Sequence, residues 1–314
     1  MKNKFTKILA ILGAFFVLKP VQVLACACGC SLFDVGTSSL LPSAQGGLAF
    51  IEYDNISQNK NWHGTSSSDA SNNELKKIDT QIVTVGGQYM FNRKWGVMAR
   101  APYVLRNVKS ATSSDEEEND AGTISQKHNS VGDVKVHAIY SGLFDDMSTG
   151  LTFGLKLPTG ANKQAGFDSD TQIGNGSTDI ILGAYHMGYI NQGATLGWFS
   201  QLSWQKPIIT KSDFHPGDEA SLSIGSYYSL GRVANFSKVS PMLQIITSKK
   251  SSDSGLNADK SNSGYSRAFI APGVELNFAQ FKIYADVELP IYENVRGNQL
   301  AVARIFKLIL GYKF

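Results

Sequence analysis

Residues 306–314 alternate between two kinds of side chain with a period of two. Large apolar side chains occupy every second position up to the final residue: Phe306, Leu308, Leu310, Tyr312 and Phe314. The positions between them hold Lys307, Ile309, Gly311 and Lys313. Because successive side chains of a β-strand point to opposite faces, the pattern predicts a strand with one face suited to lipid and a more polar face suited to an interior.

The N-terminus has the pattern of a secretory signal peptide. Lys2, Lys4 and Lys7 form a basic start, an apolar run covers residues 8–18, and Ala25 offers a small-residue cleavage site. The apolar run is shorter than the ~20 residues that a transmembrane helix needs. We favour a cleaved signal peptide over residues 1–25 to an uncleaved anchor, and we expect the mature chain to lie beyond the inner membrane.

The rest of the chain repeats the alternation in segments separated by polar connections. The pattern predicts about twelve strands. They cover residues 46–56, 79–92, 95–108, 131–144, 149–157, 178–190, 194–206, 219–230, 238–248, 264–277, 280–289 and 300–314. Short turns alternate with longer polar loops over 57–78, 109–130, 158–177, 207–218, 249–263 and 290–299.

The alternation of short and long connections selects the fold class. Bacterial outer-membrane barrels have an even number of antiparallel strands, short periplasmic turns and longer external loops. We therefore predict an all-β chain in which residues 46–314 form a transmembrane antiparallel up-and-down β-barrel in the cell outer membrane. Both termini would lie in the periplasm, and residues 26–45 would form a periplasmic N-terminal segment. A secreted β-sandwich would need neither the alternating connection lengths nor a terminal aromatic residue.

Composition agrees with one barrel and excludes some partners. The chain has 30 Gly, 17 Phe and 12 Tyr, which fits many strands joined by tight turns. A net charge of +3 is too weak to indicate nucleic-acid binding. We expect membrane lipid, lipopolysaccharide and the barrel-assembly machinery as partners, together with a small-molecule solute.

Strand phase assigns charged side chains of both signs to the lumen. The predicted pore lining comprises Glu52, Arg100, Asp133, Lys135, His137, Lys156, His186, Glu275, Lys282, Asp286, Glu288 and Lys307. Gln201 and Gln205 join them. One interpretation is a structural network, because charges buried in a narrow lumen must pair. The other is a narrow polar pore whose mixed lining gives no strong ion preference. Loop 158–177, rich in Gly and Asp, is expected to fold inward as a constriction.

The only three cysteines of the chain are Cys26, Cys28 and Cys30. Their spacing places the three thiols on one face of an extended segment, which suits a soft metal such as Cu(I). Lipid modification of Cys26 and a disulfide between Cys28 and Cys30 are the alternatives. We expect no other cofactor.

Two further polar motifs could belong to a cation site or an enzyme site, but neither has the full pattern. The acidic run at 115–118, followed by Asp120, is interpreted as a solvated external loop, with a divalent-cation site as the alternative. His128 and Ser130 have the spacing of an outer-membrane phospholipase pair, but a nucleophile also needs an oriented base and no orienting group is identifiable. We expect no enzyme activity.

Four loop-flanking phrases resemble a known family. They are Leu-Lys-Leu-Pro-Thr-Gly at 155–160, Gly-Asn-Gly-Ser-Thr-Asp at 174–179, Asp-Val-Glu-Leu-Pro-Ile-Tyr at 286–292 and Val-Arg-Gly-Asn-Gln-Leu at 295–300. Over residues 80–314 the chain is similar to the transporter-like outer-membrane barrels of the phenol meta-degradation pathway. The resemblance implies an outer-membrane channel for small, hydrophobic or aromatic molecules. The alternatives are a barrel that uses its cysteines for metal binding or electron transfer, and a structural or adhesive surface protein.

Overall fold

The structure is a computed structural model that describes residues 38–111, 123–169, 171–211 and 213–314. The described residues form β-strands and two short 3₁₀ turns, η2 (Ser38–Leu40) and η3 (Ala70–Asn72). Within these residues, no helix is long and apolar enough to cross a membrane. Residues 26–37, including the three cysteines, and the acidic run at 115–118 lie outside the described residues.

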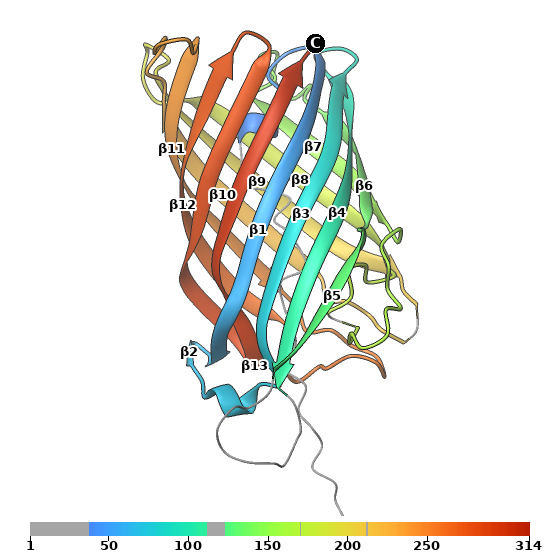
Figure 1. Cartoon of the computed structure of the whole chain (residues 1–314). Coiled ribbons are helices and arrows are strands. Elements are labelled where there is room, and N and C mark those ends of the chain that lie inside the picture. The colour runs from blue at the N-terminus through green and yellow to red at the C-terminus, as the bar shows by residue number, and fades with distance from the viewer. Residues whose placement is uncertain (1–37, 112–122, 170, 212) are drawn as a thin grey trace, which may run out of the picture.

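Thirteen strand elements follow in chain order. They are β1 (Gly46–Gly64), β2 (Ser66–Ser67), β3 (Leu75–Met90), β4 (Trp95–Ala111), β5 (Thr123–Val131), β6 (Val134–Tyr140), β7 (Thr149–Leu157), β8 (Thr178–Tyr189), β9 (Leu196–Ile209), β10 (Glu219–Tyr228), β11 (Lys238–Lys250), β12 (Tyr265–Phe278) and β13 (Phe281–Lys313). All pairings are antiparallel, each wall strand pairs with the next wall strand in the chain (β1 with β3 and β4 with β6, past the short β2 and the outlying β5), and β13 pairs back onto β1. The sheet therefore closes into a barrel (Figure 1).

The element β13 contributes two arms to the wall. Residues 281–295 pair with β12, and residues 298–313 pair with β1. Gly297 lies between the arms with a φ of 67°, a conformation that glycine adopts without a steric penalty. Within the described residues, β1, β3, β4 and β6–β12 with the two arms of β13 give twelve wall strands. The predicted antiparallel barrel of about twelve strands is confirmed.

The outer face of the wall is apolar, as the strand phase predicted. In β4, Trp95, Val97 and Tyr103 are 49%, 44% and 45% exposed, whereas Val104 and Arg106 point inward and are buried. Aromatic rings gather at the end of the barrel that holds Gly46 and Phe314, where Phe281 packs on Tyr312 at a centroid distance of 5.2 Å. We call this the near end and the opposite one the far end. An apolar exterior with an aromatic girdle matches a surface surrounded by lipid.

The final residue helps to close the barrel. The backbone N–H of Gly47 donates to Phe314 O at 2.7 Å, and Phe314 N–H donates to Gly47 O at 3.0 Å. A Cβ at Gly47 would lie 2.3 Å from the Phe314 ring, so the position has no room for a side chain. The terminal aromatic residue and this glycine thus fit one another at the seam between the first and last strands.

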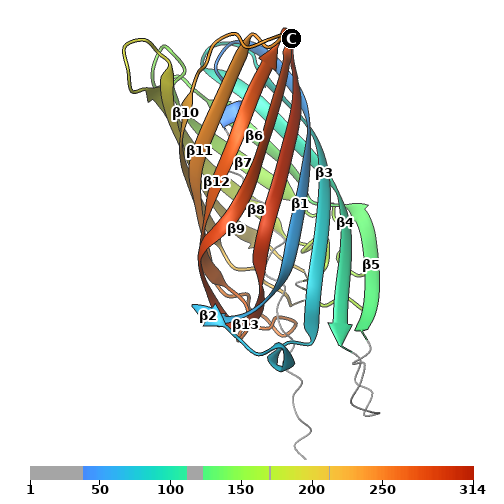
Figure 2. The same ribbon diagram turned by 60° about the vertical axis from the view of Figure 1, so that its left-hand side comes forward.

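The far end differs from the prediction. β5 lies inside the predicted loop 109–130 and pairs with the far half of β4, while β6 pairs with its near half. Figure 2 shows β5 beside the far end of β4, and among the described strands it pairs only with β4. Of the predicted strand 131–144, residues 134–140 form β6, whereas Val131 is the last residue of β5 and Gly132 and Asp133 separate the two strands. Alternation missed β5 because its side chains are largely exposed on both faces.

Candidate functional site in the barrel lumen

The N-terminal segment fills the lumen near its near end. η2 lies inside the barrel (Figure 1), and Ser39 is 1% exposed. The Ser39 hydroxyl donates to a Glu275 carboxylate oxygen, and Lys282 Nζ donates to Ser39 O at 3.1 Å. Lys282 also pairs with Glu275 at 3.3 Å. The ion pair between Lys282 and Glu275 therefore binds both the backbone oxygen and the hydroxyl group of Ser39 in the inserted turn.

Two leucines beside η2 complete this near-end insert, defined here as residues 38–42. Leu40 packs against a buried cluster formed by Leu48, Phe50, Met242, Tyr284 and Ile309. Leu41 packs against a second cluster formed by Met90, Ile139, Met147 and Tyr185. The insert thus covers apolar side chains on opposite sides of the lumen.

The middle of the lumen holds a layer of charged side chains. Arg100 donates from one guanidinium nitrogen to both carboxylate oxygens of Glu52, each at 2.8 Å. Lys307 pairs with Glu288 at 3.5 Å. Asp54 lies directly opposite Lys307 in the register between β1 and β13 and is fully buried. Charges of both signs therefore meet across the seam of the barrel.

A hydrogen-bond network joins this layer on its β11 side. The Gln244 amide donates to Tyr284 Oη and to Asp286 Oδ2, each at 3.0 Å. The Tyr284 hydroxyl also donates to Asp286 Oδ2. Hydrogen bonds to an ionised acceptor are stronger than those between neutral groups, so this network fixes one oxygen of Asp286.

Loop 158–177 closes the lumen farther along. Arg106 donates to the backbone oxygens of Thr171 at 2.7 Å and Gln172 at 2.8 Å. Ile173 is buried in an apolar cluster with side chains from the wall: Ile56, Ile82, Val104, Ile246, Phe269, Ala271, Val302 and Ile305. The predicted inward fold of this loop is confirmed.

Lys156 anchors the ends of this far-end insert, the loop 158–177. Its ammonium group pairs with Asp133 at 3.3 Å and Asp179 at 3.1 Å and donates to Ser177 Oγ at 3.0 Å. Lys156 and Asp179 are buried, so the charges are compensated by one another. Gly160 N–H donates to Asp133 Oδ1 at 2.9 Å. The same ion-pair cluster therefore holds the strand and the start of the loop.

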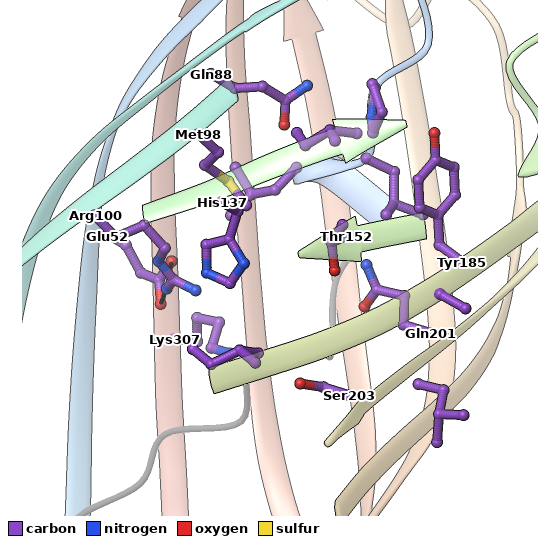
Figure 3. A pocket seen from close by; sticks show the side chains of 17 residues that line it. Glu52, Gln88, Met98, Arg100, His137, Thr152, Tyr185, Gln201, Ser203 and Lys307 are labelled. Atoms are coloured by element: carbon purple, nitrogen blue, oxygen red, sulfur yellow. Dashed lines mark hydrogen bonds and ion pairs between the residues drawn. The ribbon is translucent and has the colours of Figure 1, made fainter. Parts of the chain in front are cut away.

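A small cavity remains between the near-end insert and the charged layer. Its volume is about 80 Å³. Apolar lining comes from Leu40, Leu41, Met98, Ile139 and Tyr185, and polar lining from Glu52, Gln88, Arg100, His137, Gln201, Ser203 and Lys307. Figure 3 shows the labelled side chains converging on it from several strands. The cavity lies well below the 300–1,000 Å³ typical of drug-sized ligand sites.

A larger hollow of about 860 Å³ lies on the outer face of the wall. Small residues such as Gly87 and Ala99 form its floor, and Tyr89, Phe153 and Phe314 rise around it. Most of its lining faces lipid, but Gln88, Met98 and His137 line both this hollow and the small cavity in the lumen.

The structure places most of the predicted lining residues in the interior. Glu52, Asp133, His137, Lys156, Glu275, Lys282, Asp286, Glu288 and Lys307 are buried or nearly so inside the wall, as is Arg100 beside Glu52. Lys135 donates to Gln205 Oε1 at 3.4 Å, and Gln205 donates to Asp179. The predicted residues are therefore brought together by ion pairs and by hydrogen bonds.

The prediction that His186 lines the lumen was wrong, because its side chain lies on the outer face of the wall. It shares the face of β8 with the exposed Leu182, opposite to the buried Ile181 and Tyr185. Its ring packs on Trp198 at a centroid distance of 5.0 Å, and Nδ1 lies 2.6 Å from Thr149 Oγ1. The prediction failed because residues 180–188 carry apolar and small side chains at both parities, so their phase was ambiguous.

Several buried charged side chains were absent from the predicted pore lining, among them Asp54, Arg106, Asp179 and Arg267. Asp54 has the parity of Glu52 and could have been found from strand phase alone. Arg106 has the same parity as Arg100 in its strand, but its backbone partners on loop 158–177 could not be inferred from sequence.

The remaining candidate sites fall into two groups. The cysteine positions lie outside the described residues, and within the part of the chain that the structure describes no group of His, Cys, Asp and Glu could hold a metal ion. His128 and Ser130 share one face of β5, where the His128 ring packs against Phe167 at a centroid distance of 5.4 Å. His128 therefore contacts the far-end insert.

Comparison with known proteins identifies the fold. No model of a known protein family matches the chain, and no curated protein matches it. The structure is similar to the COG4313 outer membrane channel from Pseudomonas putida F1, with a TM-score of 0.63 and 14% identity over 90% of this chain and 100% of that one. The β domain of the Bordetella autotransporter BrkA gives a TM-score of 0.50 and 10% identity over 86% of this chain and 100% of that one.

The chain has the fold of an outer-membrane β-barrel. This confirms the predicted fold class, and the outer-membrane location follows from it, because a closed barrel with an apolar exterior and a buried polar interior is stable only when lipid surrounds it. The near end, which holds both termini of the barrel, is then the periplasmic end.

Proposed function

We propose that this barrel is an outer-membrane channel for small molecules, with small apolar or aromatic compounds as its solutes. The observation that carries the proposal is the way in which the lumen is closed. Two inserted segments, residues 38–42 and 158–177, fill the space inside a wall that is itself complete. Segments attached to the wall by a chain end or a loop can move without breaking strand pairing, so a solute can pass when they do.

The lining of the small cavity supports the solute class. Leucine, methionine, isoleucine and tyrosine side chains line one part of the cavity, and polar groups such as Gln88, His137 and Ser203 line the other, together with the charged Glu52, Arg100 and Lys307. A site that combines an apolar surface with hydrogen-bonding groups suits a small apolar molecule that carries one hydroxyl or similar group. The resemblance to barrels of the phenol meta-degradation pathway supports the same class, and the structurally similar Pseudomonas putida protein is described as a channel.

The test is uptake across an asymmetric membrane. The purified mature protein is placed in vesicles whose outer leaflet is lipopolysaccharide, because that leaflet slows apolar compounds that cross phospholipid freely. We expect faster entry of phenol than in protein-free vesicles, and little effect on a sugar of larger size. Equal entry rates with and without protein would contradict the proposal.

A variant links uptake to the far-end insert. Arg106→Ala removes the guanidinium that binds the carbonyls of Thr171 and Gln172, each charged hydrogen bond contributing about 1.5–3 kcal/mol. We expect larger single-channel conductance in planar bilayers and faster phenol entry. Lys127→Ala, at an exposed position of β5, is the matched control and should leave both unchanged.

Other predicted partners and the cysteine site complete the proposal. Lipid and lipopolysaccharide would contact the apolar exterior, and the barrel-assembly machinery would insert the chain. Cys26, Cys28 and Cys30 stay a predicted site for a soft metal such as Cu(I). Metal analysis of the mature protein, with Cys→Ser variants, tests that prediction separately.

A further inference from the structure

Outward side chains change from apolar to cationic at the far end of two wall strands. In β4, the exposed Leu105 is followed at every second residue by Asn107 and the exposed Lys109. In the second arm of β13, the exposed Phe306 has the exposed Arg304 as its next outward neighbour toward the far end. Since the near end is periplasmic, these cations lie where the wall emerges from the outer leaflet.

Strand register places a third cation between them. Lys77 of β3 lies directly opposite Lys109 of β4, while Arg304 lies opposite Ser57 of β1. Ser57 in turn lies opposite Asp79 of β3, and Figure 2 shows the four strands side by side. With about 4.8 Å between strands and about 3.3 Å per residue, the Cα atoms of Arg304 and Lys77 are about 12 Å apart. We call Lys77, Lys109 and Arg304 the outer cationic patch.

The patch carries more positive charge than its own carboxylate balances. Lys77 pairs with Asp79 at 2.8 Å. Within the described residues, neither Lys109 nor Arg304 forms an ion pair with a carboxylate. Lys109 also faces Lys77 across the strand pair, and like charges directly opposite one another destabilise a sheet. Three cations and one acid leave an excess of two positive charges, which makes the patch complementary to an anion.

The place of the patch beside the apolar belt selects a lipid anion. Leu105 and Phe306 face the acyl chains, and the cations begin one or two outward positions beyond them. Lipopolysaccharide, the lipid of the outer leaflet, joins acyl chains to phosphate groups on its sugar base, so one molecule meets both surfaces. Lysine binds phosphate as a compact charge, and arginine binds it through paired N–H groups. A free anion would meet the cations alone.

We propose that Lys77, Lys109 and Arg304 bind phosphate groups of lipopolysaccharide on the outer face of the wall. The bound phosphate relieves the repulsion between the two opposed lysines and fixes the height of the barrel in the outer leaflet. The proposal gives residues to the lipopolysaccharide contact expected above. It rests on the outer-membrane location, and it stands or falls independently of solute transport.

Binding of lipid A, the acylated and phosphorylated part of lipopolysaccharide, tests the site in the refolded mature protein. The measurement is made in non-ionic detergent with EDTA, so that no divalent cation bridges the lipid to acidic side chains. The probes are lipid A, lipid A without its phosphates, and inorganic phosphate. We expect lipid A to bind about tenfold more tightly than its dephosphorylated form, and less tightly in high salt. Equal affinities for the two lipids would overturn the proposal, as would equally effective competition by inorganic phosphate, which would identify a free anion as the ligand.

Charge variants locate the site. Lys109→Gln together with Arg304→Gln should weaken lipid A binding about fivefold, because each exposed charge pair contributes a factor of about two or more. Arg304→Lys keeps the charge and should retain most of the affinity. Lys249→Gln is the matched control, since Lys249 is an exposed outward lysine of β11 whose register partners are neutral.

Two results with these variants would refute the assignment. One is unchanged lipid A binding by the double variant. The other is wild-type binding no tighter than that of the double variant but increased when the acidic run at 115–118 is replaced by amides. That result would show that this run, and not a lipid, neutralises the patch.

Discussion

The two inserts that close the lumen are built differently. The near-end insert, residues 38–42, is a chain segment held by one ion pair and by leucines packed on wall side chains. The far-end insert, residues 158–177, is tied to the wall at both ends and along its length, through Lys156 and through Arg106. The difference indicates that the far-end insert is part of the folded core, whereas the near-end insert can leave with little loss of barrel stability.

Removing the anchor of the far-end insert should have the largest effect. Lys156→Met leaves Asp133 and Asp179 without their shared buried cation, and breaking a buried pair in this way costs about 3–5 kcal/mol. We expect a clear drop in the free energy of unfolding, measured by urea titration. Lys163→Met, at an exposed position of the same loop, should have no effect. Unchanged stability of Lys156→Met would show that the two inserts do not differ as argued.

A glycine contact inside the far-end insert should have an intermediate effect. A Cβ at Gly174 would lie 2.5 Å from the Gly160 carbonyl group, so Gly174→Ala forces the loop to move. Overpacking of this kind costs about 1–3 kcal/mol. We expect lower stability and faster cleavage of the loop by added protease. Gly193→Ala has no contact below 3.7 Å at its new Cβ and serves as the control; equal cleavage of both variants would weaken the role of the contact.

Loosening the near-end insert should have the smallest effect on stability. Replacing both Leu40 and Leu41 by alanine removes the apolar anchors of a segment that pairs with no strand. We expect a change in unfolding free energy below about 1 kcal/mol, since local units open at a lower cost than the whole fold. Single-channel conductance should nevertheless increase. Leu256→Ala, at a side chain 89% exposed, is the control. A large loss of stability would mean that the insert belongs to the core.

The wall was predictable because lipid imposes a strong contrast between its two faces. In residues 281–289, the apolar and charged parities separate cleanly, and Lys282, Asp286 and Glu288 are buried inside as expected. The contrast weakens beyond the lipid-facing belt, where both faces of a strand contact water. This explains why β5 was taken as loop and why β1 continues to Gly64, past the predicted end at residue 56.

The partners inside the lumen were much less predictable. Strand phase tells which side chains point inward, but it does not give the register that brings Asp54 opposite Lys307 across the closing seam. The choice of Thr171 and Gln172 carbonyls by Arg106 depends on the path of a loop that has no periodic pattern. The sequence therefore predicted which charged side chains lie in the lumen, but the structure was needed to show which groups they pair with.

The seam between β1 and the second arm of β13 joins segments from opposite ends of the chain. Asp54 and Lys307 face each other there, so the interior charge layer is complete only when this last pair of strands has formed. Such distant pairing is slow, because a long loop must close before any contact forms. With the seam open, Lys307 still has Glu288 of its own strand element as a partner, but Asp54 on the other edge lacks the lysine that lies opposite it in the closed barrel. The attraction between Asp54 and Lys307 therefore favours correct closure over pairing with a neighbouring chain.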